Sequence, residues 1–362
     1  MRMKNALITG WGKCTPPARL TNEHLATFLD TSDEWITSRT GIKERRISHV
    51  TLSEMAEAAA RHAMAAAGIE ASDVDVLILA TASGDTVIPS SAARLQGLLG
   101  ADKAAVMDLN SACTGFVYGL GVARSMIRSG DAQTVLLVGA DLLTWYVDWM
   151  QRESAVLFGD AAGAVVIQAS DEGNGIVASK LGCDAKGNEI LKVCEFGTGM
   201  DRFNGPKGRF PIQFDGREIF KRAVVGMGRA SSAVLDAAGW DKSDLDLVIP
   251  HQANLRIIES LAHKLDMPPE KVVVNIERYG NTSAGTIPVA LAEALEQGRI
   301  RPGDRILMAA FGAGLTWGAA ALEWGNRVEP VAVSDFELPP CDKTGLELIA
   351  DAIDHCRSLQ SA

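Results

Sequence analysis

The sequence lacks long apolar runs: none of them approaches the roughly 20 residues that a membrane-spanning helix needs. The first residues, Met1-Arg-Met-Lys-Asn, lead directly into a short strand-like run at 6–10, without the apolar core of a signal peptide. These two absences predict a cytoplasmic protein that has no membrane partner.

Positive charge and paired cysteines are also scarce. There are 35 Lys and Arg against 45 Asp and Glu, which gives a net charge of −10 and argues against nucleic acid as the main partner. The six cysteines are scattered without close pairs, a pattern typical of neither a disulfide framework nor a zinc site. We therefore expect no metal, and we expect most cysteines to be small apolar side chains.

What the sequence does contain is a repeat of a short segment. Residues 66–78 read AAGIEASDVDVLI and residues 237–249 read AAGWDKSDLDLVI, so that seven of thirteen positions are identical. Each copy predicts the end of an Ala-rich helix, a Gly stop, an acidic turn and an apolar strand. A unit that recurs in this way indicates two related halves, and we expect the functional site in the cleft between them.

Strand-like and helical runs alternate in both halves, which predicts an α/β fold with parallel sheets covered by helices on both faces. In the first half the expected elements are strands 76–80, 106–109 and 134–139 and helices 90–99 and 113–129. In the second half they are strands 247–250, 272–276 and 305–310 and helices 255–265 and 282–297.

These runs divide the chain into an N-terminal half at 1–172, a C-terminal half at 173–325 and an extension at 326–362. Residues 171–216 are rich in Gly, Asp and Asn and predict irregular strands with a surface loop. The extension contains one amphipathic pattern, at 344–356, typical of a helix. That helix could equally be a peripheral cover over an apolar patch or a lid or partner-binding arm.

Cys113 is the candidate nucleophile. It lies where the strand ending near Leu109 gives way to a helix, and side chains at such junctions point to the sheet edge at which open α/β sheets bind ligands. The dipole at the start of the helix is expected to lower the pKa of this thiol. The small neighbours Ala112 and Gly115 leave room for a substrate.

His251 and Asn281 are the candidate partners of Cys113 from the second half. His251 follows the strand of the second repeat copy, and Asn281 opens the helix that corresponds to the Cys113 helix. Each residue alone is more often structural, but the duplication predicts that both face Cys113. The Gly-dense segment 310–318 follows a strand, and it is typical either of an oxyanion hole or of a tight connection between two core strands.

Six motifs resemble β-ketoacyl-acyl-carrier-protein synthase III, a condensing-enzyme family of the thiolase superfamily. They are TSDEWI at 31–36, RTGI at 39–42, ACTGF at 112–116, FGDAAG at 158–163, HQANLRII at 251–258 and GNTSA at 280–284. The resemblance runs from Leu7 to about Trp324 and implies a thiolase-like, duplicated five-layer αβαβα fold, a homodimer and a Cys-His-Asn triad.

The resemblance also implies a role for each matching residue. Cys113 would accept the acyl group, with the backbone N–H groups of Cys113 and Ala313 as oxyanion hole, while His251 and Asn281 would hydrogen-bond the malonyl thioester carbonyl. The coenzyme A contacts would be Trp35, Arg39, Arg152 and Asn254. Arg256, with Lys264 as a weaker candidate, would dock the acidic carrier protein.

The implied reaction is a decarboxylating Claisen condensation. An acyl-CoA primer and malonyl-acyl-carrier protein would give 3-ketoacyl-acyl-carrier protein, CoA and CO2, with no cofactor beyond these substrates, and so initiate fatty acid synthesis.

The sequence departs from the family pattern in places that concern the primer. Ile88 stands where many relatives place a large aromatic at the acyl-pocket wall, Ala313 interrupts the usual triple glycine, and the segment 144–150 is bulky. Two alternatives therefore stay open. One is a related condensing enzyme for a secondary metabolite or signal molecule, with a longer primer or a non-malonyl acceptor, and the other is a non-catalytic subunit.

Overall fold

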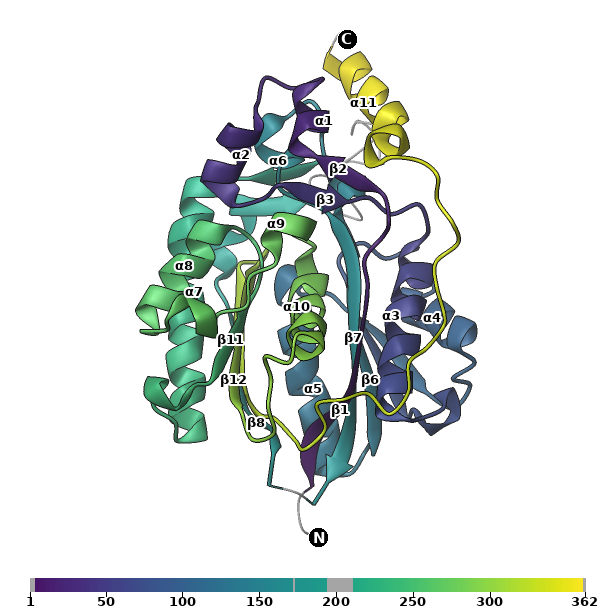
Figure 1. The fold of residues 1–362 in the computed structure, drawn as a ribbon, viewed down its shortest axis with the longest axis vertical. Helices are drawn as coiled ribbons and strands as arrows, with labels where there is room; N and C mark the ends of the chain where they lie inside the picture. The colour runs from purple at the N-terminus through teal and green to yellow at the C-terminus, as the bar shows by residue number, and fades with distance from the viewer. Residues whose placement is uncertain (1–3, 172, 194–210, 361–362) are drawn as a thin grey trace.

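The computed structural model describes residues 4–171, 173–193 and 211–360. Two β-sheets lie face to face with helices between them and helices on both outer faces, so that the chain forms five layers in the order αβαβα (Figure 1). The expected α/β, five-layer architecture is confirmed.

The first sheet has the strand order β1-β7-β6-β4-β5. Its members are β1 (Asn5–Cys14), β7 (Asp160–Ser170), β6 (Thr134–Leu142), β4 (Val76–Ala80) and β5 (Ala105–Leu109). Strands β6, β4 and β5 are parallel, whereas β1 and β7 are antiparallel to their neighbours. Strand β5 forms one edge of this sheet.

The second sheet has the order β11-β12-β13-β8. Its members are β11 (Leu247–Pro250), β12 (Arg305–Gly312), β13 (Thr316–Glu323) and β8 (Gly175–Cys183). Only β11 and β12 are parallel. The prediction of purely parallel sheets is therefore wrong, because the three residues between β12 and β13 permit a hairpin but not the crossover that a parallel pair requires.

The helices fill the remaining three layers (Figure 1). Helices α5 (Gly115–Ser129) and α10 (Thr286–Glu296) lie between the sheets and contact both. Helices α3 (Leu52–Ala67) and α4 (Ser91–Leu99) cover the outer face of the first sheet. Helix α7 (Gly216–Ala238) covers the second sheet, with α8 (Leu255–Lys264) beside it.

The repeated segment folds the same way twice, as predicted. Helices α3 and α7 end at Gly68 and Gly239, both with φ of 70°, a left-handed conformation that glycine adopts without steric cost. A short 3-10 turn follows each glycine (η1, Ala71–Asp73; η6, Lys242–Asp244), and the chain then enters β4 or β11.

The predicted strand at 272–276 is wrong. Val272 forms only an isolated bridge with Val248, and helix α9 (Ile276–Tyr279) begins where the strand was expected to end. The side chain of Gln252 replaces the missing ladder: its amide nitrogen donates to the carbonyl of Val273, and its oxygen accepts from the backbone N–H of Asn275. A side-chain amide thus satisfies backbone groups that a neighbouring strand would otherwise pair.

Short elements gather at the upper end of the molecule in Figure 1. They are β2 (Arg19–Thr21), α1 (Asn22–Ala26), α2 (Asp33–Thr40), β3 (Glu44–Arg46) and α6 (Arg152–Ala155). The 3-10 turn η3 (Leu143–Tyr146) follows β6 directly. Strands β9 (Leu191–Val193) and β10 (Ile212–Phe214) form a separate pair. Of the loop predicted within 171–216, residues 172 and 194–210 lie outside the described residues, and Cys194 is one of them.

The C-terminal extension runs across α3 and ends in α11 (Gly345–Gln360), which confirms the predicted helix (Figure 1). The N–H groups of Val331 and Ala332 donate to the carbonyls of Ala66 and Ala65 at the end of α3. Helix α11 buries Ile349, Ile353 and Cys356 in a core that also contains residues of α1 and β2. Within the described residues, no helix combines the length and apolar character needed to cross a bilayer.

Candidate active site

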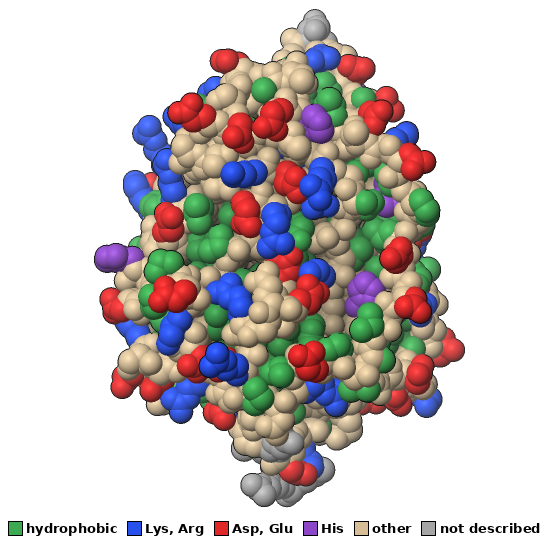
Figure 2. Space-filling view, viewed as in Figure 1, with side chains coloured by type: hydrophobic (Ala, Val, Ile, Leu, Met, Phe, Trp, Pro, Cys, Tyr) green, Lys and Arg blue, Asp and Glu red, His purple; other side chains and the backbone are tan. Residues whose placement is uncertain are grey.

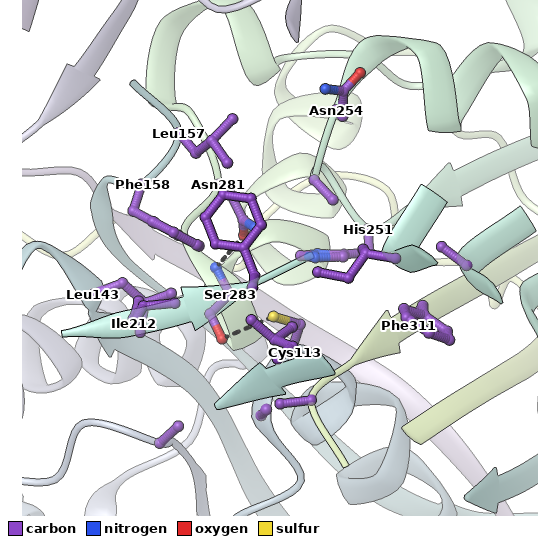
Figure 3. Close-up of a pocket in the computed structure, with 18 of the residues that line it drawn as sticks. Cys113, Leu143, Leu157, Phe158, Ile212, His251, Asn254, Asn281, Ser283 and Phe311 are labelled. Carbon is purple, nitrogen blue, oxygen red and sulfur yellow. Dashed lines mark hydrogen bonds between the residues drawn. The ribbon is translucent and has the colours of Figure 1, made fainter. Parts of the chain in front are cut away.

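A cavity of about 440 Å³ opens between the two halves, and Cys113, His251 and Asn281 all line it (Figure 3). Most of its other walls are apolar. They include Leu143, Tyr146, Leu157, Phe158, Leu191, Val193, Ile212, Phe214, Ile219, Met227, Ile257 and Phe311. The structure thus brings the three predicted triad residues together in one largely apolar site.

Cys113 lies in the 3-10 turn η2 (Ala112–Thr114), immediately before α5. Burial raises the pKa of its thiol to about 12, because a thiolate here would lose its hydration, and Asp141 adds a smaller contribution in the same direction. A hydrogen bond from the Ser283 hydroxyl to the Cys113 sulfur, 3.4 Å long, opposes this shift. The predicted lowering of the thiol pKa is therefore wrong, since burial outweighs the groups that favour the anion.

His251 follows the last residue of β11, and its backbone N–H donates to the carbonyl of Ala309 on β12. Its ring is buried, and burial lowers its pKa to about 3. The imidazole is consequently neutral at physiological pH. Its Nδ1 atom lies 2.7 Å from the Oγ1 atom of Thr286, which also lies 3.0 Å from the carbonyl oxygen of Ser283.

Asn281 follows Gly280, whose φ of 63° lets the chain turn closely against the carbonyl of Leu157. The Oδ1 atom of Asn281 accepts from the backbone N–H of Ser283 at 2.9 Å. This contact fixes the orientation of the amide, because its oxygen is engaged by a donor. The Nδ2 group, which can only donate, is thereby left for other partners.

Ser283 contacts Cys113, Asn281 and Thr286, and we did not predict it from the sequence. Its hydroxyl donates to the Cys113 sulfur, its N–H orients Asn281, and its carbonyl accepts from Thr286. The signal that could have found it is an alignment of the two turns, NSACTG at 110–115 and NTSAGT at 281–286. Ser283 has a φ of 51°, and the aligned Ala112 has a φ of 49°.

Asp141 is a second residue that the sequence did not reveal. Its buried carboxylate accepts from the hydroxyls of Thr81 and Ser83, from the N–H of Ala82, and from the N–H of Ala284 at 3.1 Å. Burial raises the pKa of Asp141, whereas hydrogen bonds from Ser283, Ala82, Ser83 and Ala284 oppose the shift. The carboxylate ties β6 of the first half to the turn that carries Ser283.

The Gly-dense segment forms the hairpin between β12 and β13, and it also lies against Cys113. A Cβ atom added to Gly312 would come within 2.9 Å of the backbone nitrogen of Cys113, so only glycine fits there. Ala313 lines the cavity. The tight strand connection is therefore present at the position where an oxyanion hole is expected, and that second role stays a prediction.

The predicted coenzyme A residues also gather in one place. The guanidinium carbons of Arg39 and Arg152 each lie 4.4 Å from the ring centroid of Trp35. Asn254 lines the cavity, and its Nδ2 donates to the carbonyl of Arg39. It therefore connects this group of residues to the cavity.

Arg256 is exposed, and its guanidinium donates to the carbonyl of Ser38 at 2.8 Å, beside the Trp35 group. Lys264 lies instead against α7, where its side chain would touch any Cβ added to Gly228.

Comparison with known proteins identifies the family. The model described as 3-Oxoacyl-[acyl-carrier-protein (ACP)] synthase III matches residues 107–185, and its C-terminal counterpart matches residues 235–324. A Beta-ketoacyl-[acyl-carrier-protein] synthase III 2 from Vibrio cholerae is 53% identical over 98% of both chains. The chain belongs to the 3-oxoacyl-[acyl-carrier-protein] synthase III family.

Other relatives and solved structures agree with this assignment. A Beta-ketoacyl-[acyl-carrier-protein] synthase III from Roseiflexus sp. is 47% identical over 88% of this chain and 98% of its own length. The crystal structure of the 3-oxoacyl-[acyl-carrier-protein] synthase III from Aquifex aeolicus superposes with a TM-score of 0.82, at 45% identity, over 88% of this chain and all of its own. The Vibrio match, at 98% coverage, also reaches into the C-terminal extension. These relatives support the role in fatty acid synthesis, and they do not favour the specialised alternative.

In this synthase III family member, one predicted pocket residue lies elsewhere. Ile88 does not line the cavity of its own chain and is 86% exposed, together with the neighbouring Val87. Within one chain Ile88 therefore has no place in the wall of this cavity, and its role at the acyl pocket stays a prediction. Tyr146, from the segment noted as bulky, lines the cavity instead, as does the preceding Leu143.

Proposed function

We propose that Cys113, His251 and Asn281 carry out the decarboxylating Claisen condensation that initiates fatty acid synthesis. An acyl-CoA primer and malonyl-acyl-carrier protein would give 3-ketoacyl-acyl-carrier protein, CoA and CO2. The observation that carries this proposal is the convergence of a thiol, a neutral imidazole and an oriented amide in one apolar cavity. A substrate bound in such a site displaces water, which strengthens every hydrogen bond to a developing charge.

In the first step the Cys113 sulfur attacks the thioester carbonyl of the acyl-CoA, and a new carbon–sulfur bond forms as the bond to the CoA sulfur breaks. The N–H groups of Cys113 and Ala313 would hold the oxyanion that forms in between. The short approach of Gly312 to the Cys113 backbone supports this arrangement, because it places the hairpin next to the nucleophile.

In the second step the malonyl thioester carbonyl hydrogen-bonds to Asn281 and His251, and loss of CO2 leaves an enolate. The enolate carbon attacks the acyl-Cys113 carbonyl, the new carbon–carbon bond forms, and Cys113 departs as a thiolate. The amide of Asn281 suits this role because it cannot lose a proton at neutral pH and its Nδ2 can only donate. Because amide and imidazole donors stabilise the enolate, this chemistry requires no cofactor.

The adenine and phosphates of coenzyme A would bind at Trp35, Arg39 and Arg152. A flat base can stack on an indole ring, and guanidinium groups pair with phosphates. Arg256, exposed beside this group at the start of α8, would meet the acidic carrier protein. Figure 2 shows Lys and Arg interspersed with Asp and Glu on the visible face, so this contact would depend on local rather than net charge.

We also propose that the enzyme is a homodimer that pairs through the edge strand β5 and works in the cytoplasm, where its substrates are made. Strand β5 is an unpaired edge, and such edges invite pairing with another strand. The exposed apolar residues Val87 and Trp145 line a depression that also includes Asp108 of β5, which supports burial at this face.

The decisive experiment incubates the protein with radiolabelled acyl-CoAs of several chain lengths and then adds malonyl-acyl-carrier protein. We expect label on Cys113 for at least one primer, followed by transfer of the label to a 3-ketoacyl product. Cys113→Ser should remain unlabelled. Absence of label for every primer would refute the proposed function.

A further inference from the structure

Arg45 on β3 is a fully buried cation. Burial lowers its pKa to about 9, and the nearby charge of Glu44 acts in the opposite direction, so the guanidinium keeps its charge at neutral pH. Among the residues that the structure describes, no carboxylate forms an ion pair with Arg45, and that of Glu44 pairs with Arg19 and Arg46 instead. A cation buried in this way is costly, and an apolar side chain of similar size would avoid the cost. Stability alone therefore does not explain a guanidinium at this position.

The guanidinium joins three segments of the chain. Its Nη1 donates to the carbonyl of Leu20 at 3.2 Å and to Oδ1 of the buried Asn22 at 2.8 Å, and its Nη2 donates to the carbonyl of Val156 at 2.7 Å. Asn22 is held in turn, because its Nδ2 donates to the carbonyl of Ile42 at 2.8 Å. Since the donors of a guanidinium form a rigid planar fork, these bonds fix Val156 relative to β2 and β3.

Val156 begins the segment that holds the backbone of Asn281. The carbonyl of Leu157 accepts from the N–H of Asn281 at 2.8 Å, and the N–H of Gly159 donates to the carbonyl of Asn281 at 3.1 Å. Phe158, between them, forms an isolated parallel bridge with Asn281, and it lines the cavity beside that residue (Figure 3). Both backbone groups of Asn281 are therefore paired with the segment that the guanidinium holds.

The stem of Arg45 also packs against this pairing. A Cβ atom added to Gly159 would lie 3.0 Å from Cβ of Arg45, and one added to Gly280 would lie 3.4 Å from it. The two glycines, one in the 156–159 segment and one directly before Asn281, thus both lie against the same side chain. A change at Arg45 would reach both sides of the pairing.

We propose that Arg45 is a positioning residue for the condensation step, which holds residues 156–159 where they keep the amide of Asn281 directed at the enolate oxygen. The inference rests on the proposed function. Arg45 does not line the cavity, so it acts only through the 156–159 segment and Asn281. Acylation of Cys113 does not use the Asn281 amide, so loss of the guanidinium should separate the two steps.

The kinetic test compares Arg45→Met and Arg45→Lys with the matched change Arg124→Met. Arg124 is the control because its guanidinium also donates to two backbone carbonyls, those of Ile176 and Val177 on β8, at 2.8 Å each. Condensation that starts from the acylated enzyme should fall about 100-fold in Arg45→Met, the effect of misplacing a reacting group by about 1 Å, while acylation of Cys113 changes less than about threefold. Arg45→Lys keeps the charge but not the fork of donors, and it should lose about tenfold in condensation. Arg124→Met should leave both steps within about threefold, since it moves no group of the site.

Hydrogen–deuterium exchange provides a readout that requires no turnover. The N–H groups of Asn281 and Gly159 should exchange about tenfold faster or more in Arg45→Met, because their pairing opens more readily, and at the wild-type rate in Arg124→Met. If Arg45→Met does not fold, Arg45→Lys decides, with faster exchange expected at the same two groups.

Wild-type exchange at both groups in the folded Arg45 variants would overturn the proposal. Equal losses in acylation and condensation would also overturn it, as would a loss of the same size in Arg124→Met. A wild-type protein that fails to acylate or to condense would refute the proposed function, whereas the exchange rates would still decide whether Arg45 positions Asn281.

Discussion

The turn at residues 110–115 and the turn at residues 281–286 occupy equivalent places in the two halves. Each begins with an asparagine whose Oδ1 accepts from the N–H two residues later, and each continues with a residue at positive φ. A 3-10 turn then leads into α5 or α10, the two helices of the middle layer. The two backbones are thus the same in hydrogen bonding and in conformation.

The side chains at matched positions differ in what they offer the cavity. Cys113 of the first turn matches Ala284 of the second, whose N–H is held by Asp141. Both asparagines line the cavity, but Asn281 of the second turn is buried, whereas the matching Asn110 is exposed. The comparison teaches that one turn design, used twice, can supply a thiol from one turn and an amide from the other to the same cavity, because matched positions differ in side chain and in burial.

The strongest test of this comparison moves the thiol between the turns. Cys113→Ala should abolish acyl labelling, and adding Ala284→Cys to that variant should not restore it, because residue 284 does not line the cavity. Labelling with acyl-CoA followed by peptide mapping measures both. Label on residue 284 would show that the two turns present the same position to the substrate.

The next test compares the two asparagines. Asn281→Ala should lower the rate of condensation about 100- to 1,000-fold, the effect of losing one oxyanion donor, while acylation of Cys113 persists. The matched change Asn110→Ala removes the same kind of turn contact at an exposed position and should leave condensation within about threefold, since it removes no such donor. Steady-state rates with malonyl-acyl-carrier protein distinguish them. Similar losses in both variants would mean that Asn281 acts only through the turn.

The third test concerns the pKa of His251, the buried histidine beside the second turn. His251 is bonded to the second turn through Thr286, and its pKa is lowered from 6.5 to about 3 in the folded protein. Between these two pH values the unfolded chain binds a proton at His251 and the folded protein does not. Stability from this residue is present above pH 6.5 and is lost as the pH falls toward 3. The loss is about 1.4 kcal/mol per pH unit, or about 2 kcal/mol by pH 5.

Urea unfolding at pH 7 and pH 5 measures this effect against His251→Asn, which cannot titrate. The difference between the two proteins isolates His251 from Asp160, whose pKa is raised to about 6 by burial and which changes stability in the opposite direction. An identical pH dependence in both proteins would contradict the expectation.

The smallest expected effect concerns the positive-φ residues. Ala112→Gly relieves a left-handed alanine but gives the unfolded chain more freedom, for a net gain of about 0.5 kcal/mol. Ser283→Gly gains the same relief but loses the hydroxyl bond to Cys113, so it should be the less stable of the two. Chemical unfolding of both variants checks the order, and a more stable Ser283→Gly would show that the hydroxyl contributes nothing.

Much of the fold was predictable because the evidence for it is local. The repeat at 66–78 and 237–249 contains its own glycine stop and strand, and both copies fold as expected. The absence of a strand at 272–276 was not predictable in the same way, since Gln252, distant in sequence, provides the hydrogen bonds that a neighbouring strand would have made. The division of the chain at 172 and 325 stays a prediction.

The triad was predictable from residue type and position, but its electrostatics was not. The pKa of Cys113 depends on walls supplied by both halves, which no local pattern reveals, and burial reversed the expected shift. Ser283 and Thr286 act through backbone and hydroxyl contacts whose geometry follows only from the packed turns. Their roles, like those of the predicted coenzyme A residues, require experiment.

The contact between Cys113 and Ser283 joins residues that are 170 positions apart. During synthesis on the ribosome, the first half is complete long before Ser283, His251 and Asn281 have been made. A nascent chain at that stage has the thiol but none of its helpers, so it cannot begin turnover. The order in which the chain is made therefore delays condensation until the residues of the second turn have been added.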